Sequence, residues 1–166
     1  LVNAKATVYN AYVGSYSDPS TAAEQATSMY NQGVDIIFAC AGGSGLGIFN
    51  AANSCKGYAF GLEGNQNSLA PNHIIASGIR DWSSFVYDTC KLALKGELTG
   101  GVIVYGISEG VLYNEHKDSN VIVNDNVISE VEHYSSLVAD GTLIIPKTLD
   151  GVESFIKTYG PTYGIG

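Results

Sequence analysis

Short apolar runs alternate with alanine-rich amphipathic segments along the first third of this chain, and this alternation most constrains its fold. The runs at residues 7–12, 35–39 and 58–61 are β-branched or aromatic and predict strands. Residues 20–32, and a later segment that ends near Ser54, place apolar side chains at helical spacing. A β-α-β-α-β succession requires right-handed parallel crossovers, so we expect one three-layer α/β domain built on a parallel sheet.

Local signals set the bounds of several elements. Asp18 is a helix-capping residue type, Pro19 suits a first helical turn, and Gly33 suits a helix end. Further along we predict helices at 82–95 and 127–139, and short strands at 73–77, 101–105, 111–113 and 142–145. We expect a single lobe over residues 1–158 and a loose tail over 159–166.

The charge balance excludes several classes of partner. The 166 residues carry a net charge of −8, and Arg80 is the single arginine. Nucleic-acid binding relies on clustered basic side chains, and docking on anionic lipid does too, so neither is expected. The three cysteines have no C-x-x-C spacing. Cys40 ends an apolar run and is expected to be a buried thiol. The three histidines share no metal spacing, so no metal is expected.

Ligands of open α/β sheets bind beyond the carboxyl ends of the strands. The loops at residues 14–18, 42–47 and 63–67 follow the three predicted strands and are polar or glycine-rich. We therefore expect them to meet at one edge of the sheet. Backbone N–H groups of the glycine-rich loop at a helix N-terminus would favour an oxygen-rich ligand, although tight turning explains the glycines equally well.

The run Ala-Gly-Gly-Ser-Gly-Leu-Gly at residues 41–47 fails three motif tests. A dinucleotide-binding fingerprint needs glycine or alanine where Ile48 stands, although Glu63 lies at a suitable distance. A nucleophile elbow needs glycine at Leu46. A phosphate-binding loop needs a Gly-Lys-Ser/Thr ending, which is missing. A nucleotide-dependent enzyme using this loop and Glu63 therefore remains only an alternative.

Six stretches in order resemble one family. They are Tyr-Val-Gly-Ser-Tyr-Ser-Asp at 12–18, Met-Tyr-Asn-Gln-Gly-Val-Asp-Ile-Ile-Phe at 29–38, the glycine-rich run at 41–47, Gly-Leu-Glu-Gly-Asn-Gln at 61–66, Ala-Ser-Gly-Ile-Arg at 76–80 and Ile-Ile-Pro at 144–146. Together they resemble the basic membrane protein family of substrate-binding lipoproteins, which includes purine-nucleoside receptors of bacterial ABC importers.

The resemblance implies the carboxyl-terminal lobe of a type I periplasmic-binding-protein fold, with the ligand held between two lobes. It implies solute binding without catalysis or a cofactor. The implied ligand-binding residues are Gly42, Gly43, Ser44, Gly45, Glu63 and Arg80. Glu63 stands where the family has a sugar-binding aspartate, and Arg80 where it has a cleft lysine. A carboxylate accepts ligand hydroxyls, and a guanidinium is a planar fork where lysine is a point charge.

The resemblance also implies partners and a location. They are a nucleoside-like ligand, an ABC permease, and a lipid-anchored place on the extracytoplasmic face of the cell membrane for the full-length protein. Residues 73–95 resemble the segment that returns to the first lobe. Without that lobe, the apolar face of the 82–95 helix is expected to pack on a second copy of the chain or on its own lobe. A ligand sensor that has lost transport is a further alternative.

Overall fold

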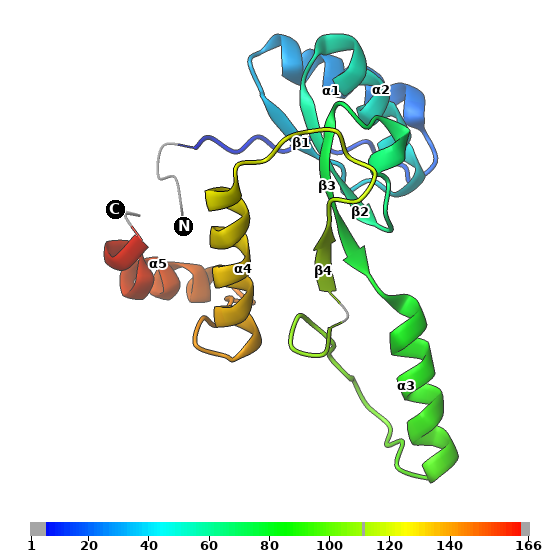
Figure 1. The fold of residues 1–166 in the computed structure, drawn as a ribbon, viewed down its shortest axis with the longest axis vertical. Coiled ribbons are helices and arrows are strands. Elements are labelled where there is room, and N and C mark those ends of the chain that lie inside the picture. Colours follow the sequence, from blue (N-terminus) through cyan, green and yellow to red (C-terminus); the bar gives the residue numbers. More distant parts are fainter. Residues whose placement is uncertain (1–5, 111, 164–166) are drawn as a thin grey trace.

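A mostly parallel four-stranded sheet organises the fold (Figure 1). The computed structural model describes residues 6–110 and 112–163. The strands lie in the order β1 (Ile36–Phe38), β2 (Tyr58–Glu63), β3 (Ile74–Arg80) and β4 (Leu112–Glu115). β1 pairs with β2 and β2 with β3 in parallel, whereas β4 runs antiparallel to β3. The expected α/β class with parallel crossovers is confirmed.

Two helices pack together on one face of this sheet. α1 (Pro19–Asn31) begins where the Asp18 carboxylate accepts the backbone N–H of Thr21, which confirms the predicted cap. α2 (Gly45–Cys55) follows a 3-10 turn at Gly42–Ser44. The two helices approach so closely that a Cβ on Gly47 would overlap the carbonyl oxygen of Pro19. Glycine at this position therefore permits the α1–α2 contact.

The core lies between these helices and the sheet. Its most buried apolar members are Ala22, Ala26, Phe49, Ala52, Ala59 and Ile74. Tyr30 of α1 closes one end of the core, and its hydroxyl donates to the carbonyl oxygen of Tyr58 over 2.7 Å. Burial raises the pKa of this phenol, so it stays a neutral donor.

α4 (Asp125–Ala139) faces the sheet across a groove. Side chains alternate between faces along a strand, so Leu62 lies opposite to the core residue Ala59 of the same strand. Leu62 borders this groove, and α4 forms its other wall without a buried residue among those described. α5 (Leu149–Tyr163) follows it. We expected a loose tail from Tyr159, but α5 continues to Tyr163, so this expectation is wrong for residues 159–163. Residues 164–166 lie outside the described part of the chain. The division into 1–158 and 159–166 stays a prediction.

α3 (Trp82–Lys95) begins and ends where the sequence predicts and projects away from the rest of the fold (Figure 1). It contains no buried residue among those described. Its exposed apolar side chains include Trp82, Val86 and Leu94, with Leu94 90% exposed. On the same helix, the Phe85 ring meets Tyr105 at 4.9 Å and Trp82 reaches Glu63, so the face contacts its own chain in part and leaves Val86 exposed.

The predicted first strand is wrong. The described residues of this segment, from residue 6 onward, are extended but form no ladder, and Val8 and Tyr12 are 80% and 88% exposed. The segment lines a cavity of about 890 Å³ together with α1 and β1, so it lies beside the edge strand without pairing to it. Of this segment, Val13 packs against the core. The composition of residues 7–12 is typical of a strand, but no strand in the described part of the chain pairs with them.

Three smaller expectations are also corrected. Residues 101–105 and 142–145 form no strand; Gly141 turns the chain back with a positive φ, and the N–H of Leu143 donates to Leu137 at the end of α4. The strand predicted at 111–113 appears as β4 from Leu112, with residue 111 outside the described part. Cys40 is exposed, since it follows β1 at the open sheet edge.

Candidate functional site

An ion pair joins the carboxyl ends of β2 and β3. Arg80 Nη1 lies 2.8 Å from Glu63 Oε1, and the two side chains are 44% and 46% exposed. The parallel register of the strands sets Glu63 beside Ile79, one residue before Arg80. The sheet therefore brings together the two charged residues that the sequence singles out, at the edge where open α/β folds bind ligands.

The Glu63 carboxylate has a second internal donor. Trp82, the first residue of α3, donates its indole N–H to Glu63 Oε2 over 3.2 Å. Each carboxylate oxygen thus meets one donor. Nothing in the sequence motifs pointed to Trp82, because its contact depends on how α3 leaves β3.

Glu63 also has an unusual backbone. Its φ is +79°, in the left-handed region that costs a residue with a Cβ on the order of 1 kcal/mol. Such conformations concentrate at binding sites, where the surrounding structure holds them in place. This feature agrees with a site at Glu63.

The glycine-rich loop lies at the same sheet edge, after β1, but much of it is engaged within the fold. Ser44 is fully buried; its hydroxyl donates to the carbonyl oxygen of Ser15 and accepts the N–H of Asp18, both at 2.8 Å. Gly45 is buried too, while Gly42 and Gly43 are exposed and pack beside Tyr16. In the described part of the chain, no hydrogen bond or ion pair links this loop to Glu63 or Arg80.

Sequence reasoning missed a buried polar cluster around Asn67 and Ser77, which holds the 63–67 loop in place. Asn67 Nδ2 donates to the carbonyl oxygens of Glu115 and Lys117, both at 2.8 Å, and Asn67 Oδ1 accepts the hydroxyl of Ser77. The Ser77 oxygen accepts the N–H of Gln66 in turn. These bonds tie the turn after β2 to β3, to the end of β4 and to the residues that follow it. The run of amide residues Asn-Gln-Asn at 65–67 was the one feature of the sequence that could have indicated this cluster.

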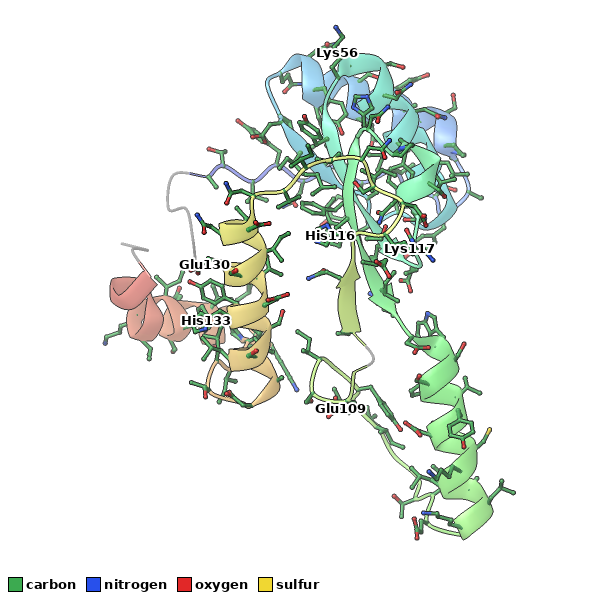
Figure 2. All side chains as sticks on the ribbon, viewed as in Figure 1. Lys56, Glu109, His116, Lys117, Glu130 and His133 are labelled. Atoms are coloured by element: carbon green, nitrogen blue, oxygen red, sulfur yellow. The ribbon has the colours of Figure 1, made fainter. Side chains whose placement is uncertain are left out.

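A groove of about 490 Å³ opens beside Arg80, between the sheet and α4. This volume falls in the range of small-molecule pockets. Its apolar walls are Leu62, Ile79, Ile107, Leu112, Ile128 and Val131. Arg80, His116 and Glu132 add polar groups, and Figure 2 shows His116 where the chain leaves β4.

The remaining candidates for chemistry are structural or exposed. His73 and His116 each pair a ring nitrogen with a backbone carbonyl, of Gly57 and Ile75 respectively. The described residues contain no group of three or more His, Cys, Asp or Glu placed to hold a metal ion. Nor does any helix within 6–110 and 112–163 combine the length and apolar character that a bilayer crossing requires.

Known proteins are similar to this chain in sequence and in fold. The family model described as "Bmp: ABC transporter substrate-binding protein PnrA-like" matches residues 1–148. Basic membrane protein D of Borreliella burgdorferi is 38% identical over 161 residues, covering 93% of this chain and 46% of that protein. Basic membrane protein A1 of Borrelia garinii subsp. bavariensis is 32% identical over 155 residues, covering 88% and 44%.

A solute-binding protein of an ABC transporter system from Aeropyrum pernix shows the same fold. Its crystal structure superposes with a TM-score of 0.71 at 20% identity, covering 92% of this chain and 52% of that one. The chain thus spans about half the length of the curated relatives and of this structure.

Proposed function

The chain belongs to the Bmp family of PnrA-like ABC transporter substrate-binding proteins, and from this premise we propose that it is the carboxyl-terminal lobe of a receptor for a nucleoside-like ligand. The observation that carries the proposal is the Glu63–Arg80 pair at the carboxyl edge of the sheet. The family is one of solute-binding proteins and not of enzymes, which agrees with the expectation from sequence.

Glu63 and Arg80 have complementary roles in this proposal. The Glu63 carboxylate accepts hydrogen bonds from ligand hydroxyls, and the Arg80 guanidinium, with five N–H donors, offers hydrogen bonds that its contact with Glu63 leaves unused. Both side chains are about half exposed, so a ligand reaches them without rearrangement of the core. In this proposal, the planar body of the ligand packs against the groove beside Arg80, whose walls are mostly apolar.

The glycine-rich loop contributes through its backbone. Ser44 and Gly45 are buried, and the Ser44 hydroxyl holds the 15–18 segment in place. Of the four predicted loop residues, Gly42 and Gly43 are the exposed pair that can approach a ligand. Ser44 and Gly45 therefore support the shape of the loop in this proposal.

The other half of the pocket comes from a second lobe. The chain covers 44–46% of two relatives, and α3 carries an exposed apolar face away from the lobe. We propose that residues 73–95 lead into that second lobe, as two-lobed binding proteins require. In the isolated 166-residue chain, the apolar face of the 82–95 helix is available for self-association.

The proposed partner of the full-length protein is an ABC permease, and its proposed place is the extracytoplasmic face of the cell membrane through a lipid anchor. Family membership supports both. A ligand sensor that has lost transport would use the same pocket, so only a transport assay distinguishes it from a transport receptor. A nucleotide-dependent enzyme has less support, because the loop fails its motifs and the matching family binds solutes.

Calorimetry on the full-length protein tests the proposal with adenosine, guanosine, inosine and uridine as probes. We expect binding of at least one probe, and a loss of about tenfold or more in affinity for Glu63→Ala and for Arg80→Ala, since each removes a charged hydrogen-bond partner. Glu130→Ala and Lys56→Gln are the matched controls, on α4 and at the end of α2, and should bind as the wild type does (Figure 2). Absence of binding to every nucleoside, or unchanged affinity in both site variants, would refute the assignment.

A further inference from the structure

The contact between Trp82 and Glu63 has a role beyond the ion pair. We propose that Trp82 is a positioning residue of the ligand site: its indole N–H fixes Glu63 Oε2 while Arg80 fixes Oε1, so the carboxylate is oriented before a ligand arrives. This inference rests on the proposed function for its effect on affinity, but the contact itself can be tested without a ligand.

The start of α3 fixes where the indole lies. Asp81 caps the helix, with its carboxylate accepting the N–H of Ser84 at 3.0 Å and the Ser84 hydroxyl at 2.6 Å. These hydrogen bonds lower the pKa of Asp81, so the cap is ionised at neutral pH. Arg80 is the last residue of β3 and Trp82 is the first residue of α3, so the cap between them fixes how the helix, and with it the indole, leaves the strand.

An aromatic contact also supports the indole ring. The Phe85 ring meets Trp82 edge-on, with centroids 6.0 Å apart and planes at 89°. Tyr105 meets Phe85 in the same way at 4.9 Å. The indole therefore has a hydrogen bond at its nitrogen and a packed ring on α3, although 57% of the residue remains exposed.

The two internal donors leave Glu63 able to bind. An ionised carboxylate has about four acceptor positions, and the indole nitrogen carries a single hydrogen. One donor on each oxygen leaves about one free acceptor position per oxygen. That arrangement suits two neighbouring ligand hydroxyls, and it orients the carboxylate without blocking it.

The ligand-free test uses the fluorescence of the 166-residue chain, because Trp82 is its only tryptophan. Excited indole moves electron density away from its pyrrole ring, so a carboxylate at Nε1 shifts the emission to longer wavelength. Glu63→Gln keeps the size of the side chain and removes the charge, and we expect emission at shorter wavelength. Glu130→Gln, a remote carboxylate on α4, should leave the emission unchanged. Emission that does not respond to Glu63→Gln would overturn the contact.

The ligand test uses the full-length protein and a double-mutant cycle. Trp82→Phe keeps a ring and removes the N–H, and we expect the affinity for the bound nucleoside to fall about fivefold. In a Glu63→Ala background the same substitution should have no further effect, whereas a merely structural role of Trp82 would lower affinity in both backgrounds. Tyr87→Phe is the control, since it removes a polar hydrogen from an exposed ring of the same helix.

The two proposals fail in different ways. Wild-type affinity in Trp82→Phe, with losses in Glu63→Ala and Arg80→Ala, overturns the role of Trp82 and leaves the binding function standing. An equal loss in both Glu63 backgrounds also overturns it. Failure of the wild type to bind any nucleoside overturns the proposed function, and the emission of Glu63→Gln then decides separately on the contact.

Discussion

Ser77 donates its hydroxyl hydrogen to Asn67 Oδ1 over 2.8 Å, and both residues are fully buried. Ser77 belongs to β3, whereas Asn67 precedes it in the turn after β2. The Asn67 amide also donates to the carbonyl oxygens of Glu115, at the end of β4, and of Lys117 just after it. The Asn67 amide thus joins the turn after β2, strand β3 and the end of β4, next to the candidate site.

We expect Asn67→Ala to lower the free energy of unfolding by about 2 kcal/mol, because it leaves buried polar groups without partners. Urea denaturation followed by circular dichroism measures the change. Asn53→Ala, at an exposed position of α2, should stay within about 0.5 kcal/mol of the wild type. Equal stability of the two variants would show that water replaces the Asn67 amide at no cost.

Gly47→Ala should destabilise the lobe by about 3 kcal/mol. The new methyl group would overlap the carbonyl oxygen of Pro19 and push α1 from α2, and overpacked cores lose stability in this range. Gly64→Ala is the matched control, since a Cβ there meets nothing within 4 Å. Thermal unfolding of both variants tests the contact, and a Gly47→Ala protein as stable as the control would contradict the close helix approach.

Stability should decline on the acid side through the cap of α1. Hydrogen bonds from the hydroxyl and N–H of Thr21 lower the pKa of Asp18 below its ordinary value of 3.8. A carboxyl with a lowered folded-state pKa stabilises the fold above the ordinary value, and this contribution is lost as the pH falls toward the folded-state pKa.

Asp18→Asn keeps a good capping side chain and removes the titration. We therefore expect its melting temperature to fall less steeply than that of the wild type between about pH 5 and pH 2. Asp88→Asn, at an exposed position of α3, should keep the wild-type slope. If the melting temperatures of Asp18→Asn and the wild type fell equally with pH, the Asp18 cap would not contribute to the loss of stability in acid.

The exposed face of α3 predicts self-association of the 166-residue chain. Val86 and Leu94 are 54% and 90% exposed, and exposed apolar patches usually mark interfaces. Analytical ultracentrifugation should show association that weakens in the double variant Val86→Ser, Leu94→Ser. Val127→Ser on α4 controls for a general change in surface polarity. A strictly monomeric wild-type chain would contradict the prediction.

The 166-residue chain alone should bind nucleosides about a thousandfold more weakly than the full-length protein. Pockets of this type bury 70–90% of a small ligand, whereas the site at Glu63 and Arg80 is half exposed on one lobe. A loss of about 4 kcal/mol gives this factor. Calorimetry on both proteins is the measurement, and equal affinities would show that one lobe forms the whole pocket.

Sequence reasoning was most accurate where the signal is local. Asp18 and Pro19 start α1, α3 runs from Trp82 to Lys95 as predicted, and β1 and β2 coincide with apolar runs. Capping and helical spacing involve residues a few positions apart, so their energies are already present in the local chain. The sequence also singled out Glu63 and Arg80, which the structure places at the carboxyl ends of β2 and β3.

Contacts between distant residues were decided by the tertiary structure. Residues 7–12 have strand composition but no ladder, because pairing needs a neighbour that composition does not specify. Ser44 is a buried link to Asp18, and Asn67 is a buried link to the end of β4. The Trp82–Glu63 hydrogen bond likewise depends on how α3 leaves β3. The sequence by itself determined most of the helices and strands and the residue types at the site. Packing decided which polar groups remain exposed to a ligand, because hydrogen bonds between distant segments form only when the fold brings them together.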